Sequence, residues 1–239
     1  YLRNAWRTKC SSPSRLRGER AEVGLPTLLF SGCRERRRLM GKRVITISRE
    51  FGSGGRTIGK KTAKRLGIPY YDKELIRKIA EETGFCQEFV ARQGEEASSS
   101  NWFFYSLSQG QAVGPNGMSM ADYLWSVQYR IIRELAEKEP CVIVGRCGDY
   151  VLEDRDDCLH VFVHAPMEFK KERILRLYGE RKEKPEKRLE EKDKKRKLYY
   201  QHYTGRDWGM AQNYHLCLDS SLIGIENCVD IIERLAKGL

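Results

Sequence analysis

The feature that most constrains the fold is a β-branched apolar run that passes directly into a glycine-rich turn, at residues 43–57 (RVITISREFGSGGRT). Because glycine lacks a Cβ atom, Gly52, Gly54 and Gly55 can adopt dihedral angles that point successive backbone N–H groups at an anion. A helix is expected next, at about 57–66. Its unpaired amides and the positive end of its dipole would add to the attraction. The pattern therefore predicts a phosphate-binding turn.

The turn departs from the usual P-loop pattern, G-x-x-x-x-G-K-[ST], in which the lysine reaches the β- and γ-phosphates and the hydroxyl holds Mg²⁺. Aligning the second glycine of that pattern with Gly54 places Arg49 at the first glycine and Gly55 at the lysine. We expect Arg56 to supply the missing charge and Thr57 to supply the hydroxyl. Thr57 is therefore the predicted metal ligand.

Three other interpretations of the turn stay open. Starting the P-loop pattern at Gly54 fits Gly59 and Lys60, but this pair falls inside the helical periodicity that follows. The spacing within 52–57 is close to the dinucleotide fingerprint, with Asp72 about twenty residues further on, although a threonine stands at the third glycine position. A strand followed by a glycine-rich turn is also a common plain βα connection.

The net charge of +11 is unevenly distributed along the chain. Residues 1–40 hold ten Lys and Arg against three Glu, which accounts for seven of the eleven net positive charges. The rest of the chain has an ordinary charge balance, which argues against nucleic-acid binding by the folded domain. Nucleic-acid binding through the basic segments stays open as an alternative. We expect residues 1–41 to be a disordered basic extension and residues 42–239 to be the folded domain. An Arg-rich targeting segment is the other interpretation of the extension.

Length and composition fit one sizeable α/β domain, since the chain has 239 residues of which 40% are hydrophobic. No stretch approaches the roughly 20 apolar residues that a membrane span needs, so no membrane partner is expected. The eight cysteines are scattered without a C-x-x-C pair. They predict buried thiols in a reducing compartment, and hence a cytoplasmic protein without a disulfide or zinc framework.

Short, continuously apolar strands alternate with helical segments along the domain, which predicts a parallel sheet covered on both faces. Strands are expected at 43–48, 68–72, 141–146, 159–165 and 215–219. Further helices are expected after Asp72, at 121–138, at 167–178 and at the C-terminus. The run at 181–197, in which charged residues dominate, predicts a solvated helix with many ion pairs.

Taken in order, these features resemble the nucleoside monophosphate kinases of the P-loop superfamily, and among them most closely the cytidylate kinase-like family, over about residues 42–239. The resemblance rests on the segments 45–57 (ITISREFGSGGRT), 68–72 (IPYYD), 144–149 (VGRCGD), 199–208 (YYQHYTGRDW) and 213–221 (NYHLCLDSS). It implies an α/β fold with a five-stranded parallel sheet and helices on both faces. It also implies a monophosphate-binding insertion at about 73–118 and a lid at about 179–209.

The resemblance further implies ATP-dependent phosphoryl transfer, with ATP and Mg²⁺ as cofactors and a nucleoside monophosphate such as CMP or dCMP as acceptor. Such catalysis consists of positioning and charge neutralisation. The donor phosphates would be cradled by Gly52, Ser53, Gly54, Gly55, Arg56 and Thr57. The catalytic residues implied are Arg56, Arg146, Lys194 and Arg196. The substrate-binding residues implied are Asp72, Arg146, Arg173 and Arg206.

Structural explanations stay open for several of these residues. Asp72 is suited to cap the helix that follows it, and Arg146 is suited to pair with Asp149 or Asp72. Arg173 is suited to plain packing within its own helix. Because Gly55 stands at the lysine position, the alternative function is a nucleotide-binding sensor or regulator that has lost the transfer reaction. Either function predicts a small-molecule nucleotide as partner and leaves homo-oligomerisation open.

Overall fold

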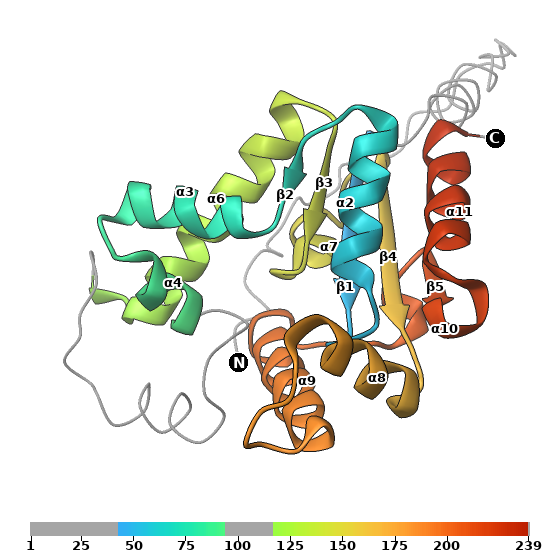
Figure 1. Ribbon diagram of the computed structural model, residues 1–239. Helices are drawn as coiled ribbons and strands as arrows, with labels where there is room; N and C mark the ends of the chain where they lie inside the picture. The colour runs from blue at the N-terminus through green and yellow to red at the C-terminus, as the bar shows by residue number, and fades with distance from the viewer. Residues whose placement is uncertain (1–42, 94–116, 239) are drawn as a thin grey trace, which may run out of the picture.

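The computed structural model describes residues 43–93 and 117–238. Its centre is a five-stranded sheet with strand order β2-β3-β1-β4-β5, in which every neighbouring pair is parallel. The strands are β1 (Val44–Arg49), β2 (Tyr70–Tyr71), β3 (Cys141–Val144), β4 (Cys158–His164) and β5 (Leu216–Asp219) (Figure 1). The predicted extension at 1–41 lies outside the described residues, as does the stretch 94–116 of the predicted insertion.

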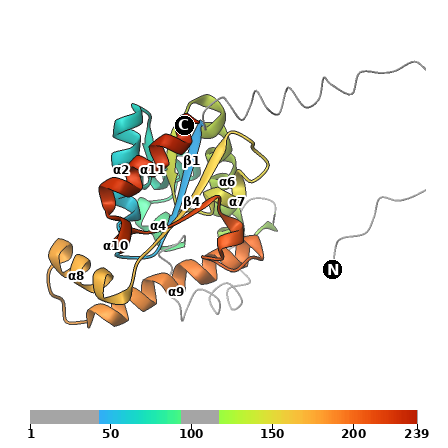
Figure 2. The same ribbon diagram turned by 90° about the vertical axis from the view of Figure 1, so that its right-hand side faces the viewer.

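Helices cover both faces of this sheet, with α2 and α11 on one face and α6 and α7 on the other. Two more helices, α8 and α9, lie across the carboxyl ends of the strands in both views (Figures 1 and 2). The helices are α2 (Gly55–Leu66), α3 (Lys73–Thr83), α4 (Gln87–Gln93), α6 (Met120–Lys138), α7 (Gly148–Val151), α8 (Met167–Tyr178), α9 (Pro185–Thr204), α10 (Ser220–Ile223) and α11 (Ile225–Lys237), with a short 3₁₀ turn η2 (Ala211–Asn213). None of them is long and apolar enough to cross a membrane.

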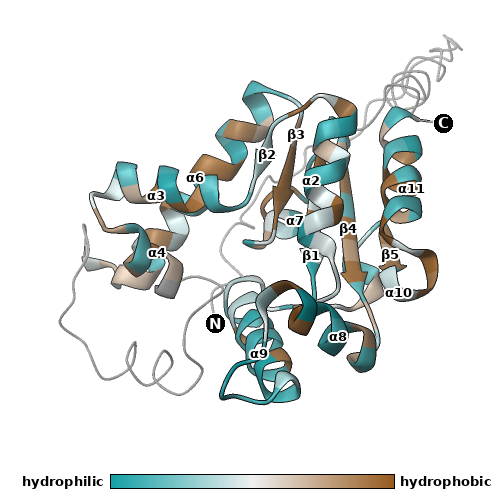
Figure 3. Ribbon diagram, viewed as in Figure 1, coloured by the Kyte–Doolittle hydropathy of each residue, from teal (hydrophilic) through white to brown (hydrophobic). Residues whose placement is uncertain are grey.

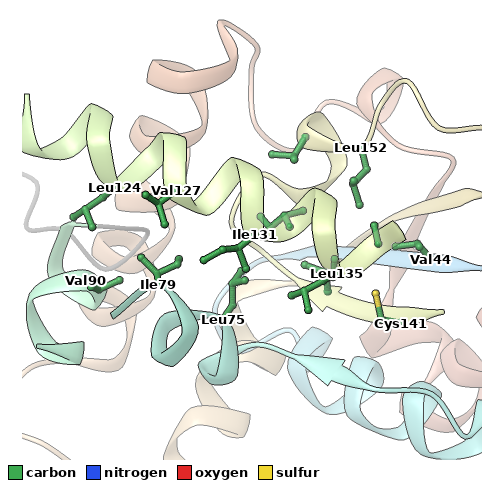
Figure 4. Close-up of a cluster of buried hydrophobic side chains, with 14 of the residues drawn as sticks. Val44, Leu75, Ile79, Val90, Leu124, Val127, Ile131, Leu135, Cys141 and Leu152 are labelled. Carbon is green, nitrogen blue, oxygen red and sulfur yellow. The ribbon is translucent and has the colours of Figure 1, made fainter. Parts of the chain in front are cut away.

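Two hydrophobic clusters hold the layers together. One lies between the sheet and α3, α4 and α6, where Leu75 and Ile79 of α3 meet Ile131 of α6 (Figure 4). The other lies between the sheet and the pair α2 and α11, and contains Ile58 of α2 and Ile232 of α11. All six residues of β1 are buried, as expected of a strand covered on both faces. In Figure 3 the strands β3 and β4 are largely hydrophobic, whereas α9 is largely hydrophilic.

The predicted α/β sheet with helices on both faces is confirmed, and most predicted elements lie within a few residues of the observed ones. The helix predicted at 167–178 coincides with α8. The strand predicted at 141–146 ends instead at Val144, because the next three residues all have positive φ. The first helix begins at Gly55, two residues earlier than expected, because Gly54 with φ 89° occupies its N-cap.

The charged run differs from the expected solvated helix. It forms most of α9, but Leu189 is buried and lies against the glycine-rich turn. Beyond the run, Tyr199 and Tyr200 extend α9 into an aromatic cluster with Trp125 and Cys147. Charge dominates the composition of this segment, yet four of the twenty residues of α9 are buried. The helix is therefore anchored at both ends.

Candidate active site

The glycine-rich turn lies at the carboxyl end of the central strand β1. Its Gly52 and Gly54 have φ of 84° and 89°, in the left-handed region that residues with a Cβ atom rarely adopt. Gly54 is the N-cap of α2 and has no side chain with which to cap it. The amide groups in the first turn of α2 are thus left for an anion, together with the positive end of the helix dipole.

The turn is fixed from several sides. The hydroxyl of Ser53, which is fully buried, donates to the carbonyl of Glu50 at 2.9 Å. The N–H of Phe51 donates to Asp193 of α9 at 2.7 Å. A Cβ atom on Gly52 would lie 3.1 Å from both Lys170 of α8 and Leu189 of α9. Helices α8 and α9 therefore close tightly around the turn and set its shape.

A cleft of about 630 Å³, counting its open mouth, lies over this turn, and we call it the donor cleft. Its described lining includes five cationic side chains: Arg49, Arg56, Arg173, Lys192 and Arg196. Glu50 is the one carboxylate in that lining, and it already accepts a hydrogen bond from Lys170 at 2.8 Å. This surplus of positive charge beside free helix amides suits a polyphosphate.

Arg173 is nearly buried, and its guanidinium donates to the hydroxyl of Thr57 at 2.8 Å. Burial lowers the pKa of Arg173, and the neighbouring charge of Arg176 adds to the shift. The predicted role of Thr57 as a Mg²⁺ ligand does not fit this arrangement, because a divalent cation would stand beside a fixed guanidinium.

Arg56 lines the donor cleft, but its Nε atom lies 2.6 Å from a carboxylate oxygen of Asp72. Although burial opposes it, the charge of Asp72 raises the pKa of Arg56 above its ordinary value. Asp72 occupies the N-cap position of α3 without making a side-chain capping bond. The helix-cap interpretation of Asp72 is therefore wrong, since its carboxylate is turned toward Arg56 and, at 4.0 Å, Arg49.

Arg146 follows β3 in a turn where Gly145, Arg146 and Cys147 have φ of 74°, 59° and 54°. Two consecutive non-glycine residues in this conformation are strained, as is common at binding sites. Arg146 is buried beside a narrow hollow of about 220 Å³, counting its open mouth, which we call the Arg146 pocket. The other lining residues are Ile79, Val90, Ala121, Leu124, Trp125, Gln128 and Tyr199.

Gln128 organises the Arg146 pocket. Its amide nitrogen donates to the carbonyl of Arg146 at 3.2 Å, and its amide oxygen accepts from the hydroxyl of Tyr199 at 3.3 Å. Sequence reasoning missed Gln128, Tyr199 and Trp125 as pocket residues. Gln128 and Trp125 of α6 belong to no motif, and Tyr199 of α9 opens the segment 199–208 without a role that the sequence indicates. The helical periodicity of α6 could have identified Gln128, because it places this polar residue on the buried face of the helix.

Two residues predicted for the site lie elsewhere. Lys194 is exposed and is not part of the donor-cleft lining, whereas Lys192 and Arg196 are. Residues four apart on a helix share a face and residues two apart do not, so this spacing could have identified Lys192. Arg206 pairs with Glu153 at 2.5 Å and lies over the ring of Tyr150, away from both cavities.

Comparison with known proteins places these features in a family context. A sequence model of the Cytidylate kinase-like family matches residues 44–222. A cytidylate kinase of Ignicoccus hospitalis is 24% identical over 194 residues, covering 80% of this chain and 98% of that protein. A cytidylate kinase of Methanopyrus kandleri is 25% identical over 187 residues, covering 74% and 84%. The crystal structure of an uncharacterized protein from Eubacterium ventriosum is 26% identical, with a TM-score of 0.59 over 80% of this chain and 97% of that one.

Proposed function

This chain belongs to the cytidylate kinase-like family, and on that premise we propose that it transfers the γ-phosphoryl group of ATP to a small acceptor. The observation that carries the proposal is the donor cleft, where five cationic side chains surround a glycine turn at a helix N-terminus. We further propose a nucleoside monophosphate as acceptor, with CMP and dCMP as the first candidates, because both curated relatives are cytidylate kinases.

In the proposed reaction, a phosphate oxygen of the acceptor bonds to the γ-phosphorus while the bond from that phosphorus to the β,γ-bridging oxygen breaks. The products are ADP and a nucleoside diphosphate, and no proton needs to move when the acceptor phosphate is fully ionised. The protein's contribution is to orient both nucleotides and to neutralise charge on the transferred group. Arg173, Lys192 and Arg196 are the donor-cleft cations suited to the second task.

The Arg146 pocket is the proposed place of the acceptor. Its arginine is suited to a phosphate, since a guanidinium can donate two parallel hydrogen bonds. Trp125 of the same pocket offers an aromatic ring, which suits a planar base. Gln128 holds the carbonyl of Arg146 and the hydroxyl of Tyr199, and so fixes the shape of the pocket. Helix α9 touches both sites, through Arg196 at the donor cleft and Tyr199 at the Arg146 pocket, and would shield the transferred group from water.

Mg²⁺ would accompany ATP, since this ion binds mainly to nucleotide phosphates and keeps several waters. Its protein ligand, if it has one, would have to be other than Thr57, whose hydroxyl is held by Arg173.

The test is a coupled assay of ADP formation with ATP and each of CMP, dCMP, UMP, AMP and GMP. We expect turnover with CMP or dCMP to exceed that with the purine monophosphates by about tenfold or more, the discrimination that one or two base contacts provide. Turnover with a purine monophosphate alone would overturn the acceptor assignment. Absence of turnover with all five would leave the alternative function below.

The alternative is a nucleotide sensor that binds without transferring. The specific observation in its favour is the glycine at position 55, where the P-loop pattern has its lysine. Calorimetry with ATP and CMP separates the two proposals. Binding of both nucleotides without product supports the sensor, whereas product formation excludes it.

A further inference from the structure

The sequence of the glycine-rich turn differs from the P-loop pattern at two positions that the structure brings into contact. Arg49 replaces the first glycine of the pattern, and Gly55 replaces its lysine. Taken separately, one change removes a glycine of the pattern and the other removes its cationic side chain. Taken together, they place a long cationic side chain at position 49 and not at position 55.

Arg49 is the last residue of β1 and lies opposite Val163 in the register with β4. Its side chain is only 8% exposed, and it forms part of the donor-cleft lining. The carboxyl end of a central strand is where ligands of parallel α/β sheets bind. The arginine is thus held in the lining of the cleft by a central strand of which every residue is buried.

The side chain of Arg49 fills the space over Gly55. A Cβ atom on Gly55 would lie 2.5 Å from Cβ of Arg49 and 3.0 Å from its Cγ, which is closer than such atoms approach. In this backbone, side chains at positions 49 and 55 cannot both be accommodated without a shift, because the two Cβ atoms would clash. The side chain of Arg49 therefore goes together with a glycine at position 55.

We propose that Arg49 contacts the terminal phosphates of the nucleotide donor in place of the P-loop lysine. The proposal rests on the function proposed above and names the residue that compensates for the apparent defect. Arg56, the candidate suggested by the alignment, is less suited, because its side chain is 47% exposed and lies 2.6 Å from Asp72. The side chain of Arg49, by contrast, is only 8% exposed at the carboxyl end of the central strand.

The change of residue also changes how a phosphate is held. A guanidinium offers two parallel donors in a fixed plane, whereas an ammonium group is a compact charge on a flexible stem. Arg49 is anchored by the strand and would bind two oxygens of one phosphate. The expected result is a donor site that depends on this one side chain as strongly as other P-loops depend on their lysine.

The first test measures binding of ATP and AMP to the full chain by calorimetry, with Arg49→Ala, Arg49→Lys and a control, Arg77→Ala. Arg77 is an exposed residue of α3 whose partners are Glu74 and Glu81. Loss of a charge-assisted contact predicts ATP binding about 10- to 100-fold weaker in Arg49→Ala, with an intermediate loss in Arg49→Lys. Because AMP lacks the terminal phosphates, its affinity should change less than threefold.

The second test restores the common pattern with the double variant Arg49→Gly/Gly55→Lys. Arg49→Gly and Gly55→Lys should each weaken ATP binding about tenfold or more, the first by removing the charge and the second by the clash with Arg49. The double variant should recover most of the wild-type affinity, because the lysine then occupies the space that the arginine has left. Recovery of ATP binding, with thermal unfolding of all variants compared, separates a phosphate contact from a purely structural role.

Two outcomes would overturn the role of Arg49. Either ATP binds to Arg49→Ala within twofold of wild type, or ATP and AMP lose affinity equally in both Arg49 variants. In either case wild type still binds ATP, so the proposed function stands. If wild type itself binds no ATP, the proposed function fails and the role of Arg49 fails with it.

Discussion

The donor cleft and the Arg146 pocket are two cavities of opposite character, joined by one helix. The donor cleft has a volume of about 630 Å³, counting its open mouth, and is lined by cations. The Arg146 pocket is smaller, about 220 Å³, and surrounds its arginine with aromatic and aliphatic side chains. Charge suits a polyphosphate, which is common to every nucleoside triphosphate, whereas a shaped pocket suits one particular acceptor. The difference suggests that selectivity lies with the Arg146 pocket.

The arginines at the two sites are held in different ways. At the donor cleft, Arg56 and Arg173 are positioned by side chains of the nearby Asp72 and Thr57. At the Arg146 pocket, the backbone itself is fixed in a positive-φ turn whose carbonyl accepts from Gln128. We therefore expect losses at the donor cleft to be graded, largest for Arg49 and smaller for Lys192, and losses at the Arg146 pocket to be concentrated on Arg146.

The largest expected effect follows from removing Arg146. In Arg146→Ala, kcat/KM for the acceptor should fall about 100-fold, since a buried charge-assisted contact contributes about 3 kcal/mol. The affinity for ATP should change less than threefold, because the donor cleft does not include this residue. Steady-state kinetics with acceptor varied at saturating ATP, combined with calorimetry of ATP binding, measures both quantities.

Arg206→Ala supplies the comparison for this experiment. Arg206 is another of the four substrate-binding residues expected from the sequence, but its guanidinium pairs with Glu153 on the exposed surface. We expect its kcat/KM to stay within twofold of wild type. If kcat/KM falls equally in Arg146→Ala and Arg206→Ala, the acceptor does not bind specifically in the Arg146 pocket. The contrast between the two cavities is then wrong as well. Arg146→Lys tests whether a decrease in Arg146→Ala reflects charge or merely the loss of packing volume.

The donor cleft could be predicted from the sequence better than the Arg146 pocket. Residues 49–57 are contiguous, so a local pattern of strand, glycines and helix was enough to predict the turn. The alternating apolar segments likewise predicted the parallel sheet, because the strands of a sheet covered on both faces are continuously apolar. Both predictions depend on short-range periodicity, which a single sequence displays directly.

The Arg146 pocket depends on contacts that no local pattern contains. Gln128 and Tyr199 are far apart in the chain, yet they share a hydrogen bond at 3.3 Å. The position of Arg49 over Gly55 is similar, since it requires the backbone geometry at both residues. Lys194 was chosen within a charged run where composition alone cannot show which side of a helix faces the cleft.

A smaller effect is expected from replacing Lys192 or Lys194. This pair tests whether the loss of ATP affinity differs from one cation to the next at the donor cleft. Lys192→Ala should weaken ATP binding about 3- to 10-fold, since a partly exposed charge contact contributes about 1 kcal/mol. Lys194→Ala removes the same charge from the opposite side of α9 and should change ATP binding less than twofold. Calorimetry at two salt concentrations measures this. If ATP affinity falls equally in both variants, Lys192 acts only through the long-range attraction between a basic surface and ATP, and it does not contact the nucleotide.

The smallest expected effect concerns Asp193, which ties α9 to the turn by accepting from the Phe51 amide. It also pairs with Arg196 of the same helix at 3.0 Å. Burial raises the pKa of Asp193 above its ordinary value, outweighing the opposing effect of Arg196. The folded state therefore binds a proton at pH values where the unfolded state has released it. The contribution of Asp193 to the free energy of unfolding is then fully present below the unfolded-state pKa, and it decreases as pH rises through the folded-state value.

Urea unfolding of wild type and Asp193→Asn across this interval tests that sign. The stability of wild type relative to the variant should decrease as pH rises, by about 1.4 kcal/mol for each unit by which the pKa is raised. The opposite slope would mean that Arg196 and Lys170, the cations facing Asp193, stabilise its ionised form more than burial destabilises it. In that case the ionised carboxylate of Asp193 would hold α9 at the donor cleft. It would also act as a counterion to the cations of the cleft, and the expected losses of ATP affinity would have to take its charge into account.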